Sequence, residues 1–180
     1  NAHKELDTGL SAWNLAMGSQ ELYDWLDAEP QLFHPGDLDY IHSVERISKF
    51  SNVISINGGV QLDLMGQENA ESTGTRQLSG VGGQMDFLEG AYRSKGGKGF
   101  ICINSSRVTK DGERKSNILA TIPGGSTISA PRTMIQYVAT EYGIASLSGK
   151  TLRERAEAMA SIAHPDFREE LMKYAQENFK

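Results

Sequence analysis

Gln77-Leu-Ser-Gly-Val-Gly-Gly-Gln-Met-Asp-Phe-Leu-Glu-Gly90 joins three closely spaced glycines, Gly80, Gly82 and Gly83, to residues with helical apolar spacing. Glycine permits positive φ angles and close approach of the main chain to a ligand. A glycine loop that leads into a helix presents free N–H groups and a partial positive charge. The stretch therefore predicts a helix over 84–92 and a loop suited to a phosphate or an oxyanion. A plain strand-to-helix turn is the alternative, because short glycine motifs are common.

Apolar periodicity predicts alternating strands and helices on both sides of this loop. Strands are expected at 11–17, 52–56, 60–64, 99–103, 116–122 and 143–147. Helices are expected at 19–29, 43–49, 84–92, 131–138, 151–162 and from Pro165 onward. This order predicts one α/β domain, residues 1–180, with an open, mostly parallel or mixed sheet covered by helices.

Local signals predict how these elements begin, end and pack. Ser19, Ser43 and His164 are expected helix N-caps, and Thr151 with Glu154 has capping-box spacing. The run 99–103 is almost wholly apolar, which predicts a strand buried on both faces, with Cys102 as an inert buried thiol. Turns are expected at 33–36 and 57–59, and polar loops at 66–74 and 104–115.

Composition excludes several classes of protein. The chain has 180 residues and a formal net charge of −5, so it lacks the basic character of a nucleic-acid-binding protein. No apolar run has the length of a membrane span, and no charged-then-apolar leader opens the sequence. Cys102 is the single cysteine, which fits a reducing cytoplasm. We expect a cytoplasmic protein, and Asn1 in place of a methionine indicates a fragment or a processed product.

Familiar catalytic and cofactor motifs are missing. The four histidines lack paired metal-ligand spacing, so no metal site is expected. The sequence has no serine-hydrolase elbow, and its glycine stretch matches neither a Walker loop nor a dinucleotide fingerprint. Single carboxylates and lysines are usually solvated surface groups, but some of them are candidates for acid–base chemistry or phosphate binding. The candidates are Glu68, Glu71, Glu89, Glu141, Lys95, Lys98 and Lys110.

Seven motifs in order resemble the C-terminal domain of the acetyl-CoA hydrolase/transferase family, especially 4-hydroxybutyrate and butyrate:acetate CoA-transferases. They lie at 63–67, 69–71, 76–87, 94–98, 137–145, 149–156 and 162–171, and 18–24 extends the likeness. The resemblance implies a CoA-transferase-like α/β fold. It also implies that CoA or acyl-CoA is a substrate and that no cofactor is tightly bound.

The resemblance implies a ping-pong reaction through acyl-enzyme anhydride and glutamyl-CoA thioester states. In such enzymes the loop matching Gly80-Val81-Gly82-Gly83 lies at the thioester, and Gly82 and Gly83 would be the catalytic N–H donors to its oxyanion. CoA contacts are implied for Asn57 and Gly58, and for a lysine best matched by Lys110. The sequence around Lys110, from 107 to 115, departs from the family, as does Glu68, where a small or aliphatic residue is common.

The nucleophilic glutamate of the family is expected just before this chain, since no matching motif occurs between Asn1 and Gly18. The resemblance thus implies partnership with an N-terminal domain of the same enzyme, short-chain carboxylate substrates, and a homo-oligomer. The sequence leaves two other hypotheses open: an acyl-CoA hydrolase and a non-catalytic CoA-binding module.

Overall fold

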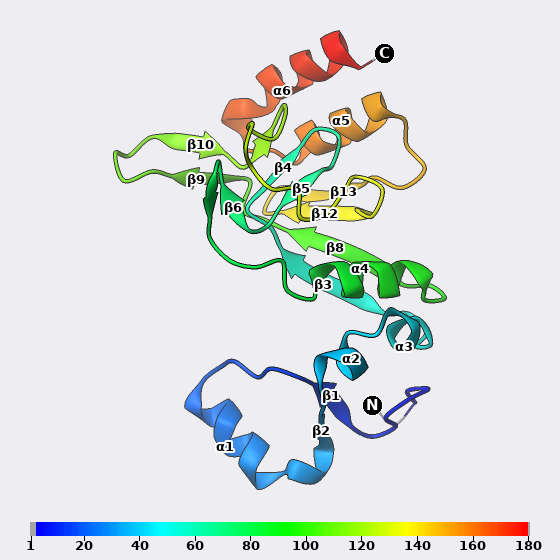
Figure 1. Cartoon of the computed structure of the whole chain (residues 1–180). Helices are drawn as coiled ribbons and strands as arrows, with labels where there is room; N and C mark the ends of the chain where they lie inside the picture. Colours follow the sequence, from blue (N-terminus) through cyan, green and yellow to red (C-terminus); the bar gives the residue numbers. More distant parts are fainter. Residues whose placement is uncertain (1–2, 180) are drawn as a thin grey trace.

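The computed structural model describes residues 3–179, which form a small N-terminal lobe (residues 3–50) and a larger body (residues 52–179). Figure 1 shows the lobe at the bottom and the body above it. In the lobe, β1 (Ser11–Trp13) pairs in parallel with β2 (Phe33–Pro35), and α1 (Gln20–Ala28) and the turn η1 (Pro30–Leu32) connect them. The turn expected at 33–36 is therefore largely strand, because β2 finds a partner distant in sequence.

Two short helices join the lobe to the body. They are α2 (Leu38–Ile41) and α3 (Val44–Ser48), and α3 packs against α4 (Gln84–Arg93) of the body. The hydroxyl of Ser43 accepts a hydrogen bond from the Arg46 N–H, as expected of an N-cap. Ser19 occupies the N-cap of α1 but its side chain makes no capping hydrogen bond. This junction places the start of α4 beside the lobe.

The body is built on a mixed four-stranded sheet in the order β13-β12-β8-β3. Its strands are β3 (Ile54–Gly58), β8 (Lys98–Cys102), β12 (Tyr137–Thr140) and β13 (Gly143–Ser146). The first three run parallel and β13 is antiparallel to β12. Helix α4 crosses between β3 and β8, as in a βαβ unit, and packs on one face of the sheet. The predicted mixed α/β class is confirmed.

A second sheet and two hairpins complete the body. The sheet has the order β11-β4-β5, with β4 (Gln61–Asp63), β5 (Glu68–Asn69) and β11 (Ile118–Leu119). The hairpins are β6 (Ser72–Thr73) with β7 (Arg76–Gln77), and β9 (Ser106–Val108) with β10 (Arg114–Ser116). The loops expected at 66–74 and 104–115 were therefore wrong in part. These strands consist mostly of polar residues, so they lack the alternation of apolar and polar residues that predicts a strand.

Two helices close the chain, α5 (Leu152–Ser161) and α6 (Pro165–Asn178). The capping box is confirmed: the Thr151 side chain accepts from the Glu154 N–H, and the Glu154 side chain accepts from the Thr151 N–H. His164 caps α6 by accepting from the Asp166 N–H. These caps satisfy N–H groups that helix starts leave without partners.

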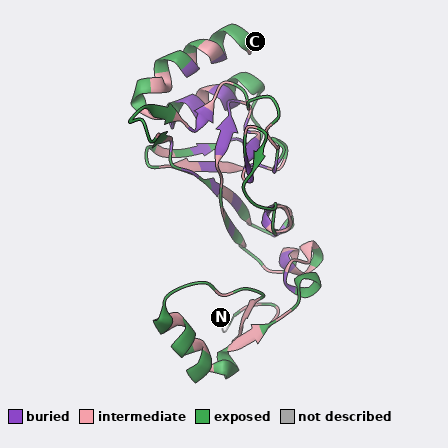
Figure 2. Cartoon of the chain, turned by 60° about the vertical axis from the view of Figure 1, so that its left-hand side comes forward, coloured by how far each residue is buried: buried purple, intermediate pink, exposed green. Residues whose placement is uncertain are grey.

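The hydrophobic core lies between the sheets, α4, α5 and α6. Its fully buried members include Leu62, Leu64, Leu88, Ile101, Ile118, Ile135, Val138, Leu147 and Met159. Figure 2 shows the buried residues concentrated in the body, while the lobe is exposed or half-buried almost throughout. The body therefore has the packing of a folded domain, and the lobe does not.

Three further expectations were wrong. The segment 131–138 is not a helix: it forms a turn at Pro131 and enters β12, where Val138 pairs with Ile101. Strand β3 continues through Asn57 and Gly58, where a turn was expected. Burial in β8 alternates instead of covering both faces, and Cys102 is exposed. In each case pairing with a distant strand overrode the local pattern.

Candidate functional site

The glycine loop ends at the first turn of α4. Gly82 has φ = +61°, a left-handed conformation that favours glycine, and Gly83 is the N-cap of the helix. Within residues 3–179, the N–H groups of Gly82 and Gly83 donate no hydrogen bond to another residue. Gly80 and Val81 are exposed on the approach to them. The loop therefore presents two free donors at the positive end of a helix dipole.

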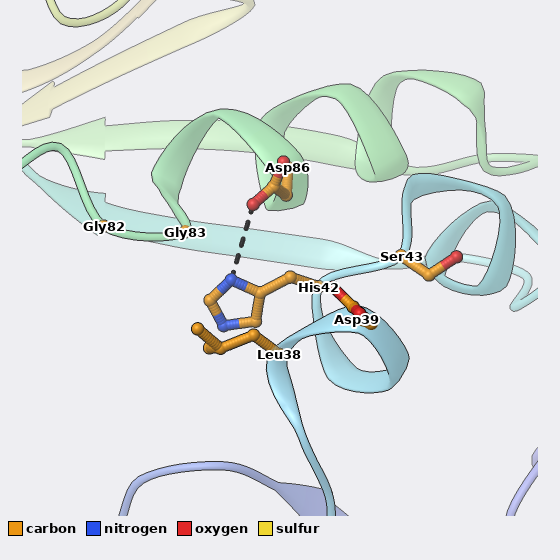
Figure 3. A pocket seen from close by; sticks show the side chains of 7 residues that line it. All are labelled: Leu38, Asp39, His42, Ser43, Gly82, Gly83 and Asp86. Atoms are coloured by element: carbon orange, nitrogen blue, oxygen red, sulfur yellow. Dashed lines mark ion pairs between the residues drawn. The ribbon is translucent and has the colours of Figure 1, made fainter.

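These two glycines line a cavity of about 490 Å³ between the lobe and the body. The other lining residues are Leu38, Asp39, His42, Ser43 and Asp86 (Figure 3). Leu38 and Asp39 come from α2, while Asp86 comes from the first turn of α4. The loop thus opens onto space, which is what a ligand-binding loop needs and what a plain strand-to-helix turn does not require.

The imidazole of His42 lies against the loop, although no pattern in the sequence marks this histidine as a site residue. A Cβ built on Gly83 would lie 2.1 Å from Cε1 of His42, so the imidazole packs directly against the glycine. Nδ1 of His42 lies 3.4 Å from Oδ2 of Asp86 (Figure 3). Nε2 of His42 lies 3.0 Å from Nδ2 of the Asn14 side-chain amide. Contacts from the lobe and from α4 therefore fix the ring beside the loop.

Glu68 supports the same helix start from inside the body. Its Oε2 accepts a hydrogen bond from Nε2 of Gln84, the residue that follows Gly83. The carboxyl group is fully buried, and within residues 3–179 its Oε1 has no hydrogen-bond partner. Burial raises the pKa of Glu68 to about 8, against the hydrogen bond from Gln84, which lowers it. Glu68 is therefore neutral at pH 7 and adds no negative charge near the loop.

The remaining predicted contacts lie apart from this cavity. Asn57 and Gly58 end strand β3, where Nδ2 of Asn57 donates to Oγ of Ser55 at 2.8 Å. A second hollow of about 440 Å³ lies at the same carboxyl ends of the parallel strands; it is lined by Gly59, Cys102, Ile103, Asn104, Ala139 and Thr140. Lys110 is exposed at the tip of the β9–β10 hairpin, which Figure 1 shows extending away from α4.

The other candidate carboxylates have structural partners. Glu71 is buried and accepts hydrogen bonds from the side chains of Gln77 and Ser129. Burial opposes ionisation of Glu141, but hydrogen bonds from Ser105 outweigh it and hold the pKa of Glu141 below its usual value. Glu89 forms an ion pair with Arg93 on α4. None of the three lines the cavity beside the glycine loop.

The described residues give no sign of two other kinds of site. No group of three or more histidine, cysteine or acidic side chains in residues 3–179 is placed to hold a metal ion. No helix in this part of the chain has the length and apolar character needed to cross a bilayer.

The fold and the glycine loop define an α/β domain of the kind found in CoA-transferases. The chain belongs to the acetyl-CoA hydrolase/transferase family: residues 18–175 match the family described as acetyl-CoA hydrolase/transferase C-terminal domain. A butyryl-CoA:acetate CoA-transferase from Anaerostipes caccae is 43% identical over 97% of this chain. A 4-hydroxybutyrate coenzyme A transferase from Clostridium kluyveri is 44% identical over 99% of it.

The structural comparison agrees. The crystal structure of RipA from Yersinia pestis has a TM-score of 0.87 and 39% identity over 98% of this chain. The chain spans only part of each of these proteins: 39% of the Anaerostipes transferase, 41% of the Clostridium transferase and 39% of RipA. The matching family is described as a C-terminal domain, the part of a longer protein that follows its other domains.

Proposed function

We propose that this chain is the C-terminal part of a CoA-transferase that moves CoA from an acyl-CoA to a short-chain carboxylate. The substrates would be of the acetate, butyrate or 4-hydroxybutyrate class, by analogy with the names of the relatives. The observation that carries the proposal is the pair of free N–H groups at Gly82 and Gly83, two residues that line a cavity at the start of α4. Donors fixed in this way stabilise charge that develops on a carbonyl oxygen.

In the proposed reaction, a glutamate carboxylate from the preceding region attacks the thioester carbonyl. The C–S bond breaks, which gives an acyl-glutamyl anhydride and CoA thiolate. The thiolate then attacks the glutamyl carbonyl, the acyl carboxylate leaves, and a glutamyl-CoA thioester remains. A second carboxylate reverses these steps and takes the CoA. Each attack places negative charge on a carbonyl oxygen, and the N–H groups of Gly82 and Gly83 would bind that oxygen.

Neighbouring groups would keep the loop in place. The imidazole of His42 packs on Gly83 from the lobe side, and Gln84 is tied to Glu68 from the body side. A neutral Glu68 adds no negative charge at the helix start, whose positive end favours an anionic intermediate. Asn57, Gly58 and Lys110 remain proposed contacts to the rest of the CoA molecule.

The test is Gly82→Ala in the enzyme that contains this chain and the preceding region. At φ = +61° an alanine is strained, so the loop must shift and its N–H groups no longer point at the oxyanion. We expect kcat for acyl-CoA:carboxylate exchange to fall roughly 10- to 100-fold, with a smaller change in KM. Gly149→Ala is the matched control, because Gly149 also has a positive φ, +71°, but lies in the turn before α5 and does not line the cavity. Equal rates in Gly82→Ala and wild-type enzyme would contradict the proposed role of the loop.

Assays on the same enzyme, and on this chain alone, distinguish two other functions. The family name includes hydrolases, in which water takes the place of the second carboxylate. Release of free CoA at an equal rate with and without acetate would favour the hydrolase. This chain alone is expected to give no turnover, because the proposed nucleophile lies outside it. Saturable CoA binding by an inactive enzyme that includes the preceding region would favour a binding module.

A further inference from the structure

The four-stranded sheet of the body has one covered face and one bare face. Strand register places seven apolar or weakly polar side chains on the bare sheet face: Ile54, Ile56, Phe100, Cys102, Tyr137, Ala139 and Ile144. Ile54 is 51% exposed, Ile56 68% and Ile144 63%. Phe100 and Tyr137 stack with ring centroids 4.9 Å apart at the centre of this face. Lys98 is the one charged residue that the four strands place on it.

The opposite face shows what a covered face of this sheet looks like. Ser55, Ile101, Val138 and Ala145 are all buried there, under α4 and α5. Gly99 on this face lies so close to α4 that an added Cβ would be 2.9 Å from Cδ2 of Leu88. The two faces carry similarly apolar residues, yet only one has helices on it.

A bare apolar face is unusual for this kind of sheet. Parallel strands occur in sheets that are covered on both faces, and their sequences are apolar on both faces for that reason. The run Phe100-Ile-Cys-Ile103 has this composition, although half of it faces outward in this structure. Large exposed apolar patches mark surfaces that bind a partner. The sequence of β8 is therefore that of a strand whose second face is also buried.

We propose that the bare sheet face is the interface with the polypeptide region that precedes this domain in its relatives. This inference rests on the proposed function in one respect, namely that the chain works as part of a longer enzyme. The relatives have about three fifths of their length outside the matched region, which is ample to cover a sheet. The bare face also reaches Gly58 and Cys102 at the strand ends, beside the proposed CoA contacts. A partner seated there would meet the same substrate.

The single cysteine provides a direct probe, because Cys102 lies on this face and is exposed. The experiment measures alkylation of Cys102 by N-ethylmaleimide, followed by mass spectrometry, in this chain and in the protein extended by the preceding region. We expect ready reaction in the chain alone and a rate at least about tenfold slower in the extended protein, because burial limits access to opening events.

The matched control is a double variant, Cys102→Ser with Val108→Cys. Val108 is 59% exposed on β9, away from the sheet face, so its thiol should react equally in both proteins. The control also allows a comparison within the extended protein alone. There, Cys102 should be protected from alkylation, while the thiol introduced at position 108 should not. Equal reactivity of the two thiols in the extended protein would overturn the proposal.

A second copy of this chain is the alternative occupant of the bare sheet face. If Cys102 in this chain alone becomes protected as concentration rises, and sedimentation shows a dimer, a second copy covers the face and the proposal is wrong. Ile56→Asp adds a second test, since it should change the stability of the chain alone very little but expose Cys102 to alkylation in the extended protein. None of these measurements uses catalysis, so an inactive enzyme with a protected Cys102 would refute only the proposed function.

Discussion

The lobe and the body of this chain are held together by different forces. In the described part of the lobe, the buried apolar residues are Ile41 and Ile47, whereas the body has a continuous apolar core. The lobe instead gathers around Asp7, whose carboxylate accepts hydrogen bonds from Arg46 and from the Tyr40 hydroxyl and lies 3.1 Å from His34. Apolar packing is cooperative over many residues, while a polar cluster depends on the few groups that form it.

This difference matters because the candidate cavity lies between the two regions. Leu38, Asp39 and His42 come from the lobe side, and Gly82 and Gly83 come from the body. One wall of the site therefore stands on the well-packed core, and the other on a polar cluster. Substitutions in the lobe or in the body alone show how far the stability of each region depends on its own contacts.

The largest expected effect is the pH dependence that Glu68 gives to the body. The pKa of Glu68 is about 8 in the folded chain against an ordinary 4.5, so folding retains a proton that unfolding releases between these values. Its contribution to stability is full below pH 4.5 and is lost as pH rises to about 8, a difference of about 5 kcal/mol. Glu68→Gln stays neutral, so its free energy of unfolding should exceed the wild-type value increasingly from pH 5 to pH 9.

Urea denaturation followed by far-UV circular dichroism at several pH values measures this difference. Glu89→Gln is the matched control, because it also replaces a glutamate of the body, but one that pairs with Arg93 at the surface of α4. Parallel stability curves for wild type and Glu68→Gln across this pH range would show that Glu68 is ionised at pH 7.

Loss of core packing should be the next largest effect. Leu88 is 1% exposed on α4 and faces the sheet at Gly99, so Leu88→Ala leaves a cavity that costs about 3 kcal/mol of body stability. Leu15→Ala in the lobe, where Leu15 is 69% exposed, should cost about 0.5 kcal/mol or less. The midpoints of urea denaturation compare the two. Similar losses in both variants would mean that the lobe is packed as tightly as the body.

Asp7→Asn tests the polar cluster of the lobe. Burial opposes ionisation of Asp7, but its hydrogen bonds, first that from Arg46, outweigh burial and lower the pKa of Asp7 to about 2. Its contribution is therefore present above pH 3.8 and lost as pH falls towards 2, the opposite sign to Glu68. Replacing the charged acceptor should cost about 2 kcal/mol. The two tryptophans, Trp13 and Trp25, both lie in the lobe, so tryptophan fluorescence reports its loosening separately from the body.

In this lobe variant the circular dichroism transition of the body should move little. Arg153→Ala is a suitable control, because it removes a charged group from an exposed pair with Glu157 on α5. If Asp7→Asn lowers the stability of both regions equally, the lobe and the body unfold as one unit.

The smallest expected effect concerns the cap of α5. Thr151→Ala removes the hydroxyl that accepts from the Glu154 N–H and should cost about 1 kcal/mol of body stability. Thr127→Ala, whose hydroxyl makes only a long side-chain contact of 3.5 Å to Gln77, serves as the control. Thermal melting compares the two variants. An equal shift of the melting temperature in both would show that the Thr151 cap does not stabilise the body.

Local chemistry allowed several elements to be predicted from residues alone. Gly83 before Gln84, the capping box at Thr151 and the cap at His164 each depend on groups a few residues apart. The helix expected at 131–138 failed because Met134, Ile135 and Val138 fit a helical period as well as the turn and strand they form. The Ser106–Ser116 hairpin was missed although it contains Asp111-Gly112, a typical hairpin turn pair, because its polar strands lack apolar alternation.

The sequence by itself determined the glycine loop, the helix that follows it and the family to which the chain belongs, because these depend on order and spacing along the chain. The tertiary structure decided which distant groups meet. It placed His42 against Gly83, buried Glu68 under the start of α4, and left one apolar face of the sheet bare. Such contacts follow from the pairing of strands and the packing of helices, whose partners are remote in sequence, so no local pattern encodes them.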